Sequence, residues 1–291
     1  ALASRTNVIL EGKRIGEKVK IIPYDQDINF IDIHSEFDMR LSELLIKHES
    51  VKPNQKWIIM FEEFERYYDL ERGNCLVCGN DKLLPWAKHE YFKAVECDKC
   101  GFVYMNPSVN AEGINEYYSN YIGDRFKNQK KMEDRAIQYE IDAEFLESYV
   151  SEGKILDVGC NGGFFLEKLS DSFEKYGIEV DPEAVAFANQ NYDYDIRHGE
   201  IGEDDFKEGF FDVIIFRGVI EHMLDPRKAL ERSTKLLKKG GLIYFCATPN
   251  LKSLGAYLYR EKWNLWHPIE HINIFDSKTL HILLGEDVYS K

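Results

Sequence analysis

Four cysteines stand in two Cys-x-x-Cys pairs separated by eighteen residues: Cys75, Cys78, Cys97 and Cys100. A glycine directly follows each pair, which permits the tight turn of a zinc knuckle. Four thiolates at this spacing suit one tetrahedral zinc ion, and four protein ligands leave no open position for catalysis. Two disulfides are the alternative, but cysteines three residues apart close poorly on each other. We therefore predict a structural zinc site.

A glycine-rich turn flanked by acidic residues forms a second chemical pattern. The run KILDVGCNGGFF, residues 154–165, joins an apolar stretch to glycines, and Glu179 ends the next apolar stretch. Glycines let the backbone approach a ligand closely, and a carboxylate at the end of the second strand can bind both hydroxyls of a ribose. The dinucleotide pattern Gly-x-Gly-x-x-Gly is absent. The spacing therefore indicates a nucleoside-binding site.

Apolar strands alternate with helices around this turn and must position it. A short third strand is expected over 196–200 and a buried strand over 211–216. A helix up to Lys239, the turn Gly240–Gly241 and a buried strand over 242–246 follow. Such alternation is typical of a parallel sheet covered on both faces. The predicted fold class is α/β, with a Rossmann-like sheet.

The glycine-rich turn resembles motif I of the class I S-adenosylmethionine-dependent methyltransferases, an acidic residue followed by three alternating glycines. Asp157 matches the acidic position, Gly159 and Gly163 match two glycines, and Asn161 replaces the middle one. The segments FDVI, IEHMLDP and LLKKGGLIYFCATPN resemble the family's stretches around its fourth and fifth strands, so the resemblance covers residues 127–284. Together with the cysteine pairs, it extends to a bacterial and archaeal subgroup with an amino-terminal zinc ribbon. Members of that subgroup commonly belong to polysaccharide, lipid or secondary-metabolite pathways.

This resemblance implies that the turn binds S-adenosylmethionine. Asp157 would contact the methionyl amino group, and Glu179 would bind the ribose hydroxyls. Glu200, or one of Asp204 and Asp205, would face the adenine, and Tyr121 would form a lid. The cofactor-binding residues that it implies are Asp157, Gly159, Cys160, Gly163, Glu179, Glu200 and Tyr121.

Three histidines are candidates for removing a proton from the methyl acceptor, because the intrinsic pKa of imidazole lies near neutrality. His222 follows the fourth expected strand, at the edge where ligands bind in such folds, and Glu221 could orient it. His271 belongs to a segment that resembles the family's His-x-x-x-Phe-Ser-x-x-Thr-Leu stretch, which implies an acceptor-pocket position and a helix beginning at Asp276. His267 is a weaker candidate. We predict His222 and His271 as catalytic residues; for His222, packing against the cofactor is the alternative.

The composition favours an enzyme that does not bind nucleic acid. The 291-residue chain has a formal charge of −14, whereas nucleic-acid binding relies on Lys and Arg to neutralise phosphates. No apolar run reaches the length of a membrane span. Six cysteines, four of them in knuckles, suit a reducing compartment, so we expect a cytoplasmic protein.

The predicted parts are an extension of unknown role, the zinc ribbon and the methyltransferase domain: 1–70, 71–107 and 108–291. In the extension, the sequence favours a hairpin over 7–22 and a helix over 37–48. A complete class I domain has seven strands, whereas little chain follows the helix expected over 277–284. The last strands are therefore cut off, belong to a longer parent protein, or come from the amino-terminal hairpin or a second subunit.

The leading functional hypothesis is methyl transfer to a hydroxyl of a glycan or another small biosynthetic intermediate. One alternative is C-methylation of a nucleotide-linked keto sugar, since some sugar C-methyltransferases also carry an amino-terminal zinc module. Another is a nucleic-acid-binding or scaffold protein with an inert Rossmann domain. The acidic and glycine positions of motif I argue against inertness, and the negative charge argues against nucleic acid.

Overall fold

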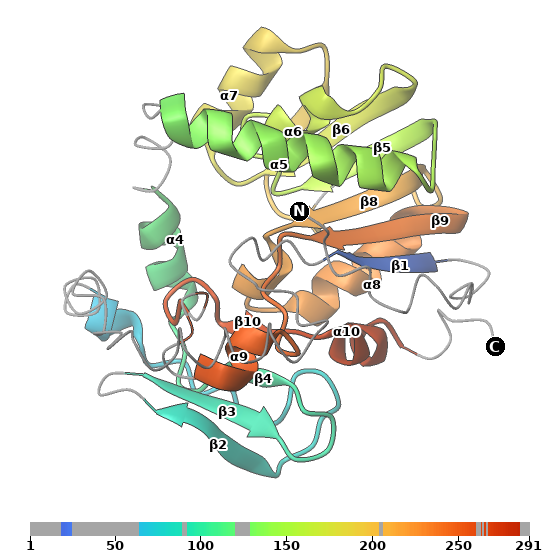
Figure 1. Cartoon of the computed structure of the whole chain (residues 1–291). Helices are drawn as coiled ribbons and strands as arrows, with labels where there is room; N and C mark the ends of the chain where they lie inside the picture. Colours follow the sequence, from blue (N-terminus) through green and yellow to red (C-terminus); the bar gives the residue numbers. More distant parts are fainter. Residues whose placement is uncertain are drawn as a thin grey trace, which may run out of the picture.

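Two β-sheets organise the chain in this computed structural model (Figure 1). The described residues are 19–24, 64–88, 92–119, 129–203, 206–259, 263, 265 and 267–285. The helix expected over 37–48 lies outside them, as does most of the hairpin expected over 7–22. Tyr121 and the pair 204–205 also lie outside the described residues.

The larger sheet has six parallel strands in the order β1-β9-β8-β5-β6-β7. The strands are β1 Val19–Tyr24, β5 Gly153–Val158, β6 Phe173–Glu179, β7 Asp195–His198, β8 Phe211–Arg217 and β9 Leu237–Cys246. The order reverses between β5 and β8, and ligands bind outside the carboxyl ends of strands at such a switch point. The expected Rossmann-like α/β fold is confirmed.

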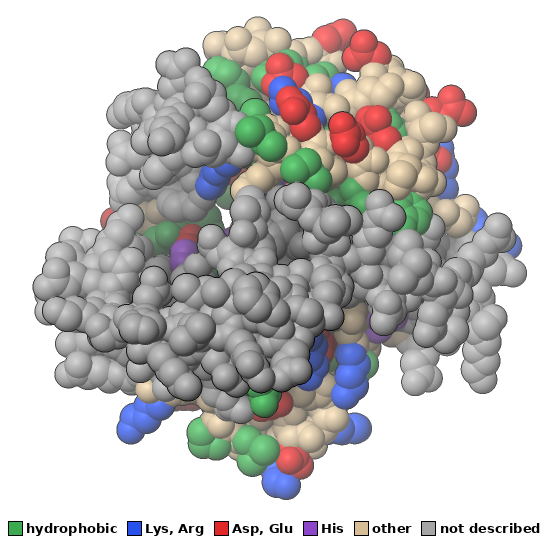
Figure 2. All heavy atoms as spheres, in the orientation of Figure 1, with side chains coloured by type: hydrophobic (Ala, Val, Ile, Leu, Met, Phe, Trp, Pro, Cys, Tyr) green, Lys and Arg blue, Asp and Glu red, His purple; other side chains and the backbone are tan. Residues whose placement is uncertain are grey.

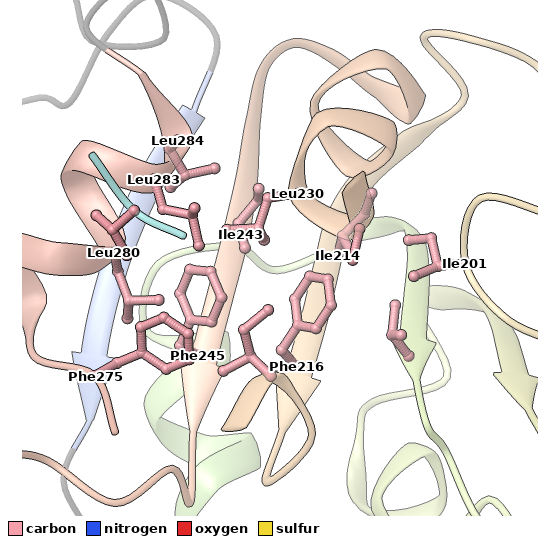
Figure 3. Close-up of a cluster of buried hydrophobic side chains, with 14 of the residues drawn as sticks. Ile201, Ile214, Phe216, Leu230, Ile243, Phe245, Phe275, Leu280, Leu283 and Leu284 are labelled. Carbon is pink, nitrogen blue, oxygen red and sulfur yellow. The ribbon is translucent and has the colours of Figure 1, made fainter. Parts of the chain in front are cut away.

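Alternate residues of the central strands form two separate cores. In β8, Ile214 and Phe216 pack in one cluster, whereas Val213 and Ile215 pack in another. Because successive side chains of a strand point to opposite faces, a strand that is apolar throughout needs cover on both sides. Figure 3 shows the first cluster, where Phe216 stacks beside Phe245 of β9 at 5.5 Å between ring centroids.

Helices cover both faces of this sheet. The helices are α5 Gln129–Glu147, α6 Phe164–Lys168 and α7 Pro182–Asn191 on one face, with α8 Pro226–Leu236 and α10 Ser277–Leu284 on the other. Helix α10 begins where expected, because the Asp276 carboxylate accepts a hydrogen bond from the Thr279 N–H in a capping box. The Asp181 side chain caps α7 by accepting a hydrogen bond from the Glu183 N–H. Among the described residues, no helix has the length and apolar character needed to cross a bilayer.

The boundary between α8 and β9 differs from the expected one. The helix predicted to reach Lys239 ends at Leu236, and the expected turn Gly240–Gly241 lies inside β9. The N–H groups of Gly209 and Phe210 donate hydrogen bonds to the last two carbonyls of α8, at 2.9 and 2.8 Å. Helix-end carbonyls need such partners, and here they come from the neighbouring chain, so the helix stops early.

Strand β1 occupies the edge of the large sheet beside β9. Its backbone pairs in parallel from Val19 with Gly241 to Tyr24 with Cys246. A segment from the predicted extension therefore adds one parallel strand next to β9.

The smaller sheet is antiparallel and has the order β10-β4-β3-β2. Its strands are β2 Leu83–Lys88, β3 Lys93–Cys97, β4 Val103–Met105 and β10 Asn273–Ile274. The predicted ribbon supplies three strands, and the end of the chain supplies the fourth. Trp86 and Met105 of this sheet share a core with Trp263 and Ile272. The loop before β10 is thereby packed against the ribbon.

Short elements complete the described fold: η1 Glu65–Tyr67, α4 Ala111–Ser119, η2 Ile220–His222 and α9 Leu254–Tyr259. Helix α4 lies between the two sheets (Figure 1), and η2 follows β8 directly.

Candidate active site

A cavity of about 720 Å³ opens at the carboxyl ends of β5, β6 and β8. The turn after β5, the segment after β7, η2, α4 and α8 form its wall. Asn161, Glu179, Glu200 and His222 are among its lining residues. In Figure 2, a histidine and neighbouring acidic atoms lie at the bottom of an opening. This volume is in the range of small-molecule binding sites and is larger than one small chemical group would need.

The turn after β5 presents backbone to this cavity. Gly159 has a φ of 71°, and a Cβ built on it would lie 2.7 Å from Cγ2 of Val219, so glycine is required. Asn161 also has a positive φ, 51°. Asn is the residue that best tolerates this conformation after glycine, which explains why it can replace the middle glycine of the motif.

Glu179 is held in a fixed orientation at the end of β6. Its two carboxylate oxygens accept hydrogen bonds from the N–H groups of Asn161 at 2.8 Å and Asp181 at 2.9 Å. Each oxygen has further lone pairs, and the residue lines the cavity. Glu179 is thus arranged to accept hydrogen bonds from two neighbouring hydroxyls of a ligand.

Asp157 is buried and only partly satisfied. Its side chain is 2% exposed, and no described group donates a hydrogen bond to its Oδ1. Burial raises its pKa to about 8; the charge of Arg217 opposes this shift, and that of Glu179 adds to it. A cationic ammonium group brought beside Asp157 would supply the missing donor and favour the ionised form. Asp157 is not among the residues that line the cavity, so its contact with the methionyl end of S-adenosylmethionine stays a prediction.

Of the other residues expected to bind the cofactor, some line the cavity and some do not. Glu200 lines the cavity. Gly163 is the N-cap of α6, with a φ of 80°. Cys160 is buried, with its sulfur against the backbone of Gly177, so its side chain packs in the core. Neither Gly163 nor Cys160 lines the cavity, and both roles stay predictions.

A hydrogen bond from Nδ1 fixes the position of the ring hydrogen of His222. Its Nδ1 lies 2.7 Å from the carbonyl oxygen of Glu270. A carbonyl can only accept, so Nδ1 carries the hydrogen, and Nε2 of the neutral ring has a free lone pair. The ring lines the cavity and meets the edge of Tyr118, at 6.0 Å between ring centroids. His222 is therefore placed to accept a proton.

Glu221 does not orient His222 through a hydrogen bond. Its Oε1 is 3.8 Å from Nε2 of His222, too far for one, and its Oε2 accepts a hydrogen bond from Thr248 at 3.1 Å. The backbone carbonyl of Glu270 fixes the His222 ring instead. Burial raises the pKa of Glu221, which is 1% exposed.

The three candidate histidines form a contiguous group. His271 stacks on His267 at 4.8 Å and approaches His222 at 4.9 Å between ring centroids. Nδ1 of His271 donates to the carbonyl oxygen of Leu265 at 2.7 Å, so its Nε2 also has a free lone pair. Burial, together with the two neighbouring imidazoles, lowers the pKa of His271 to about 3. His271 is neutral at physiological pH and does not line the cavity.

Glu270 joins this group to α4. Its carboxylate accepts hydrogen bonds from Nδ1 of His267 and from the Tyr117 hydroxyl, the latter at 2.9 Å. Burial alone would raise its pKa, but the hydrogen bond from His267 and the neighbouring imidazoles outweigh it and bring the pKa to about 2.

Sequence reasoning did not assign Asn161 and Tyr118 as site residues. The motif position of Asn161 was a usable signal, because a residue with positive φ there must lie in the cofactor turn. Tyr118 belongs to the tyrosine-rich segment that also contains Tyr121, and only the fold shows that it reaches the cavity.

The four expected zinc ligands lie together in the ribbon. Sγ atoms are 3.5 Å apart between Cys75 and Cys100 and between Cys78 and Cys97, and all four lie within 4.8 Å of one another. All four are free thiols. In a tetrahedral site with Zn–S bonds of about 2.3 Å, the sulfurs are about 3.8 Å apart. The glycine after each pair has a φ of 72° or 81°, as the knuckle turn requires. The cluster therefore fits a zinc ion.

Hydrogen bonds join the ribbon to the elements around the cavity. Arg72 donates to the carbonyl oxygens of Leu224 at 3.0 Å and Ile272 at 3.3 Å. Arg227 of α8 donates to two carbonyls of the first knuckle, at 3.0 and 2.6 Å. Asn273 of β10 donates to the carbonyl of the residue after η2 at 2.7 Å. The ribbon thus supports the segments that carry His222 and His271.

The sequence profile of the methyltransferase domain family matches residues 128–286, more than half of the chain. The chain belongs to the methyltransferase domain family. This assignment confirms the expected class I S-adenosylmethionine-dependent methyltransferase domain, and the parallel sheet with its switch point agrees with it.

Curated relatives match the central part of the chain. A ubiquinone biosynthesis O-methyltransferase from Methylococcus capsulatus is 30% identical over 124 residues, 40% of this chain and 52% of that protein. One from Pelagibacter ubique is 37% identical over 117 residues, 36% of this chain and 45% of that protein. The chain thus spans about half the length of these two relatives. Among solved structures, the PH0226 protein from Pyrococcus horikoshii has 21% identity and a TM-score of 0.45, covering 58% of this chain and 87% of that one.

Proposed function

We propose that this protein transfers a methyl group from S-adenosylmethionine to a hydroxyl oxygen of a glycan or another small biosynthetic intermediate. The observation that carries the proposal is the cavity at the switch point, which has Glu179 on one wall and the free Nε2 of His222 on another. The O-methyltransferases among the curated relatives support oxygen as the methylated atom.

Two carboxylates would hold the cofactor, which supplies a methyl group activated by its sulfonium. Asp157 would bind the ammonium group, which gives its unpartnered Oδ1 a donor. Glu179, already fixed by two backbone N–H groups, would bind the ribose hydroxyls. Glu200 would lie on the adenine side. These contacts orient the reacting carbon, and orientation is the main catalytic requirement of an in-line displacement.

His222 would act on the acceptor. Its Nε2 has a lone pair directed by the Nδ1 hydrogen bond, so it can accept the proton of a hydroxyl placed in the cavity. The oxygen then forms its bond to the methyl carbon as the carbon–sulfur bond breaks. Tyr118, in edge contact with the His222 ring, would form part of the acceptor wall.

The cysteine cluster would hold a structural zinc ion in the ribbon, residues 71–107. Its role would be to fix the ribbon that supports β10 and the segment after η2. Residues 108–291 would form the methyltransferase domain, which β1 extends.

Methyl transfer from labelled S-adenosylmethionine to a panel of hydroxyl-bearing glycans and phenols, with amines as a comparison panel, tests the proposal. We expect label in a hydroxyl acceptor, and NMR of the product identifies the methylated atom. The His222→Gln variant should bind S-adenosylhomocysteine normally and lose transfer by about 10²-fold or more, since general-base catalysis contributes at least that much. Methylation on nitrogen or carbon, or unchanged transfer by His222→Gln, would contradict the proposal.

A further inference from the structure

We propose that Glu221, His222 and His271 bind a divalent transition-metal ion at the acceptor end of the cavity. One oxygen or nitrogen from each of the three residues lies within 4.8 Å of the other two. The inference rests on the proposed methyl transfer to a hydroxyl at the same site, and it gives His222 the role of a metal ligand in place of the proposed base. It adds a metal that is distinct from the cysteine-bound zinc.

Hydrogen bonds orient both His222 and His271 as metal ligands. Each donates its Nδ1 hydrogen to a backbone carbonyl at 2.7 Å, His222 to that of Glu270 and His271 to that of Leu265. This leaves both Nε2 lone pairs free and fixes the orientation of both rings. An imidazole whose second nitrogen donates to a carbonyl is the usual form of a metal-bound histidine.

Glu221 supplies the anionic ligand. The side chain is 1% exposed, and its Oε2 is held by the Thr248 hydroxyl at 3.1 Å. Its Oε1 faces Nε2 of His222 at 3.8 Å, and the backbone N–H of Glu221 itself also donates to the carboxylate. A buried carboxylate is costly unless it is paired or binds a metal. A cation held by this triad would place a positive charge beside the buried carboxylate.

The ligand atoms must approach one another by up to about 1.5 Å to hold a metal, since they lie within 4.8 Å of one another. With metal–ligand bonds of about 2.0–2.1 Å, neighbouring ligand atoms in a tetrahedral site lie about 3.3 Å apart. The 3.8 Å between Glu221 and His222 is close to this value. Two imidazoles and one carboxylate favour zinc, iron or cobalt over magnesium or calcium. Three protein ligands leave a coordination position, and His222 brings the group to the cavity wall.

A neighbouring triad of similar compactness, made of His267, Glu270 and His271, is a poorer ligand set. Nδ1 of His267 is hydrogen-bonded to the Glu270 carboxylate, whose other oxygen accepts from Tyr117 at 2.9 Å. These atoms already satisfy each other. The metal therefore belongs on the Glu221 side.

A metal at this point would change how the acceptor loses its proton. The acceptor hydroxyl would bind the open position through its oxygen, and the positive charge would favour loss of its proton to water. The oxygen would then form its bond to the methyl carbon while the carbon–sulfur bond breaks. His222 would serve as a ligand in place of the base.

Zinc stoichiometry and zinc titration test the site without an acceptor. Purified protein with its cysteine site filled is titrated with ZnCl₂, and bound zinc is measured by mass spectrometry after gel filtration. We expect two zinc ions per chain in the wild type and one in His222→Gln, with the second ion bound at least 100-fold more weakly. His267→Gln is the matched control and should retain two, because only the neighbouring triad uses its side chain.

One zinc ion per chain in the folded wild type would overturn the inference, as would loss of the second ion in His267→Gln but not in His222→Gln. Titration of the same samples with S-adenosylhomocysteine separates this result from the proposed function. Normal binding of S-adenosylhomocysteine with a single zinc ion would remove the second metal site alone. Two zinc ions without binding of S-adenosylhomocysteine would support the metal site and contradict the cofactor assignment.

Discussion

Replacing Asp157 by Asn should remove the pH dependence of cofactor binding. Burial raises the pKa of Asp157 to about 8 in the free protein. About 1% of this carboxyl group is ionised at pH 6 and about 9% at pH 7. If the ammonium group of the ligand binds the ionised form, affinity should rise about ninefold between these pH values. The bound cation lowers the pKa of Asp157, so binding also releases a proton.

Isothermal titration with S-adenosylhomocysteine at pH 6 and pH 7 measures both effects. At pH 7 about 0.9 proton should leave per ligand bound, which appears as a dependence of the binding enthalpy on the ionisation enthalpy of the buffer. Asp157→Asn should bind more weakly than the wild type at pH 7 and show equal affinities at the two pH values. The variant retains Glu179, so it also controls for titration of that group. Wild-type affinity that is independent of pH would refute the reasoning.

The same shift sets the sign of a stability effect. The pKa of Asp157 is higher in the folded protein than in the unfolded chain, where it is near 4, so the folded form binds more protons between pH 4 and 8. The stability contributed by this group therefore falls as pH rises through that window. In the ligand-free protein, Asp157→Asn should raise the melting temperature at pH 8 more than at pH 5. An equal effect at both pH values would contradict the shifted pKa.

Three further substitutions test the turn, the cysteine cluster and the ribbon contact. Gly159→Ala introduces a Cβ 2.7 Å from Val219 at a φ of 71°. Calorimetry should therefore show a free energy of unfolding lower by about 1–2 kcal/mol, and S-adenosylhomocysteine should bind more weakly. Unchanged affinity would contradict the close approach of the turn to the ligand. Cys97→Ser should lower the zinc content and unfold or aggregate the ribbon, as seen by mass spectrometry and proteolysis, whereas a stable variant with full zinc content would refute the site. Arg227→Met removes two hydrogen bonds to the first knuckle. Urea unfolding should show a free energy of unfolding lower by about 1–2 kcal/mol, and the zinc content should be retained. Wild-type stability would show that the contact is dispensable.

Local signals predicted the elements that hold the cofactor side of the site. The helix expected to begin at Asp276 has its cap partner three residues away, and this cap forms. The boundary of α8 was missed because its last carbonyls accept from Gly209 and Phe210, more than twenty residues earlier. A sequence pattern over one helix does not contain that information.

The acceptor side depends on contacts between distant segments. The carbonyl that orients His222 belongs to Glu270, forty-eight residues later, and carbonyl groups carry no sequence signal. The pairing of β10 with β4 joins the end of the chain to the ribbon, which no spacing indicated. Sequence could therefore name the histidines as candidates, while their tautomers and their approach to Glu221 required the fold.

Titration of the purified chain with S-adenosylhomocysteine tests whether Glu179 and the turn after β5 bind the cofactor. We expect one binding site per chain in the wild type and an affinity at least tenfold weaker in Glu179→Ala, which removes the carboxylate assigned to the ribose. Glu174→Ala is the matched control, since it removes an exposed acid from the same strand, β6, and should bind like the wild type. Absence of binding by folded wild-type protein, or equal affinity in Glu179→Ala, would contradict the account.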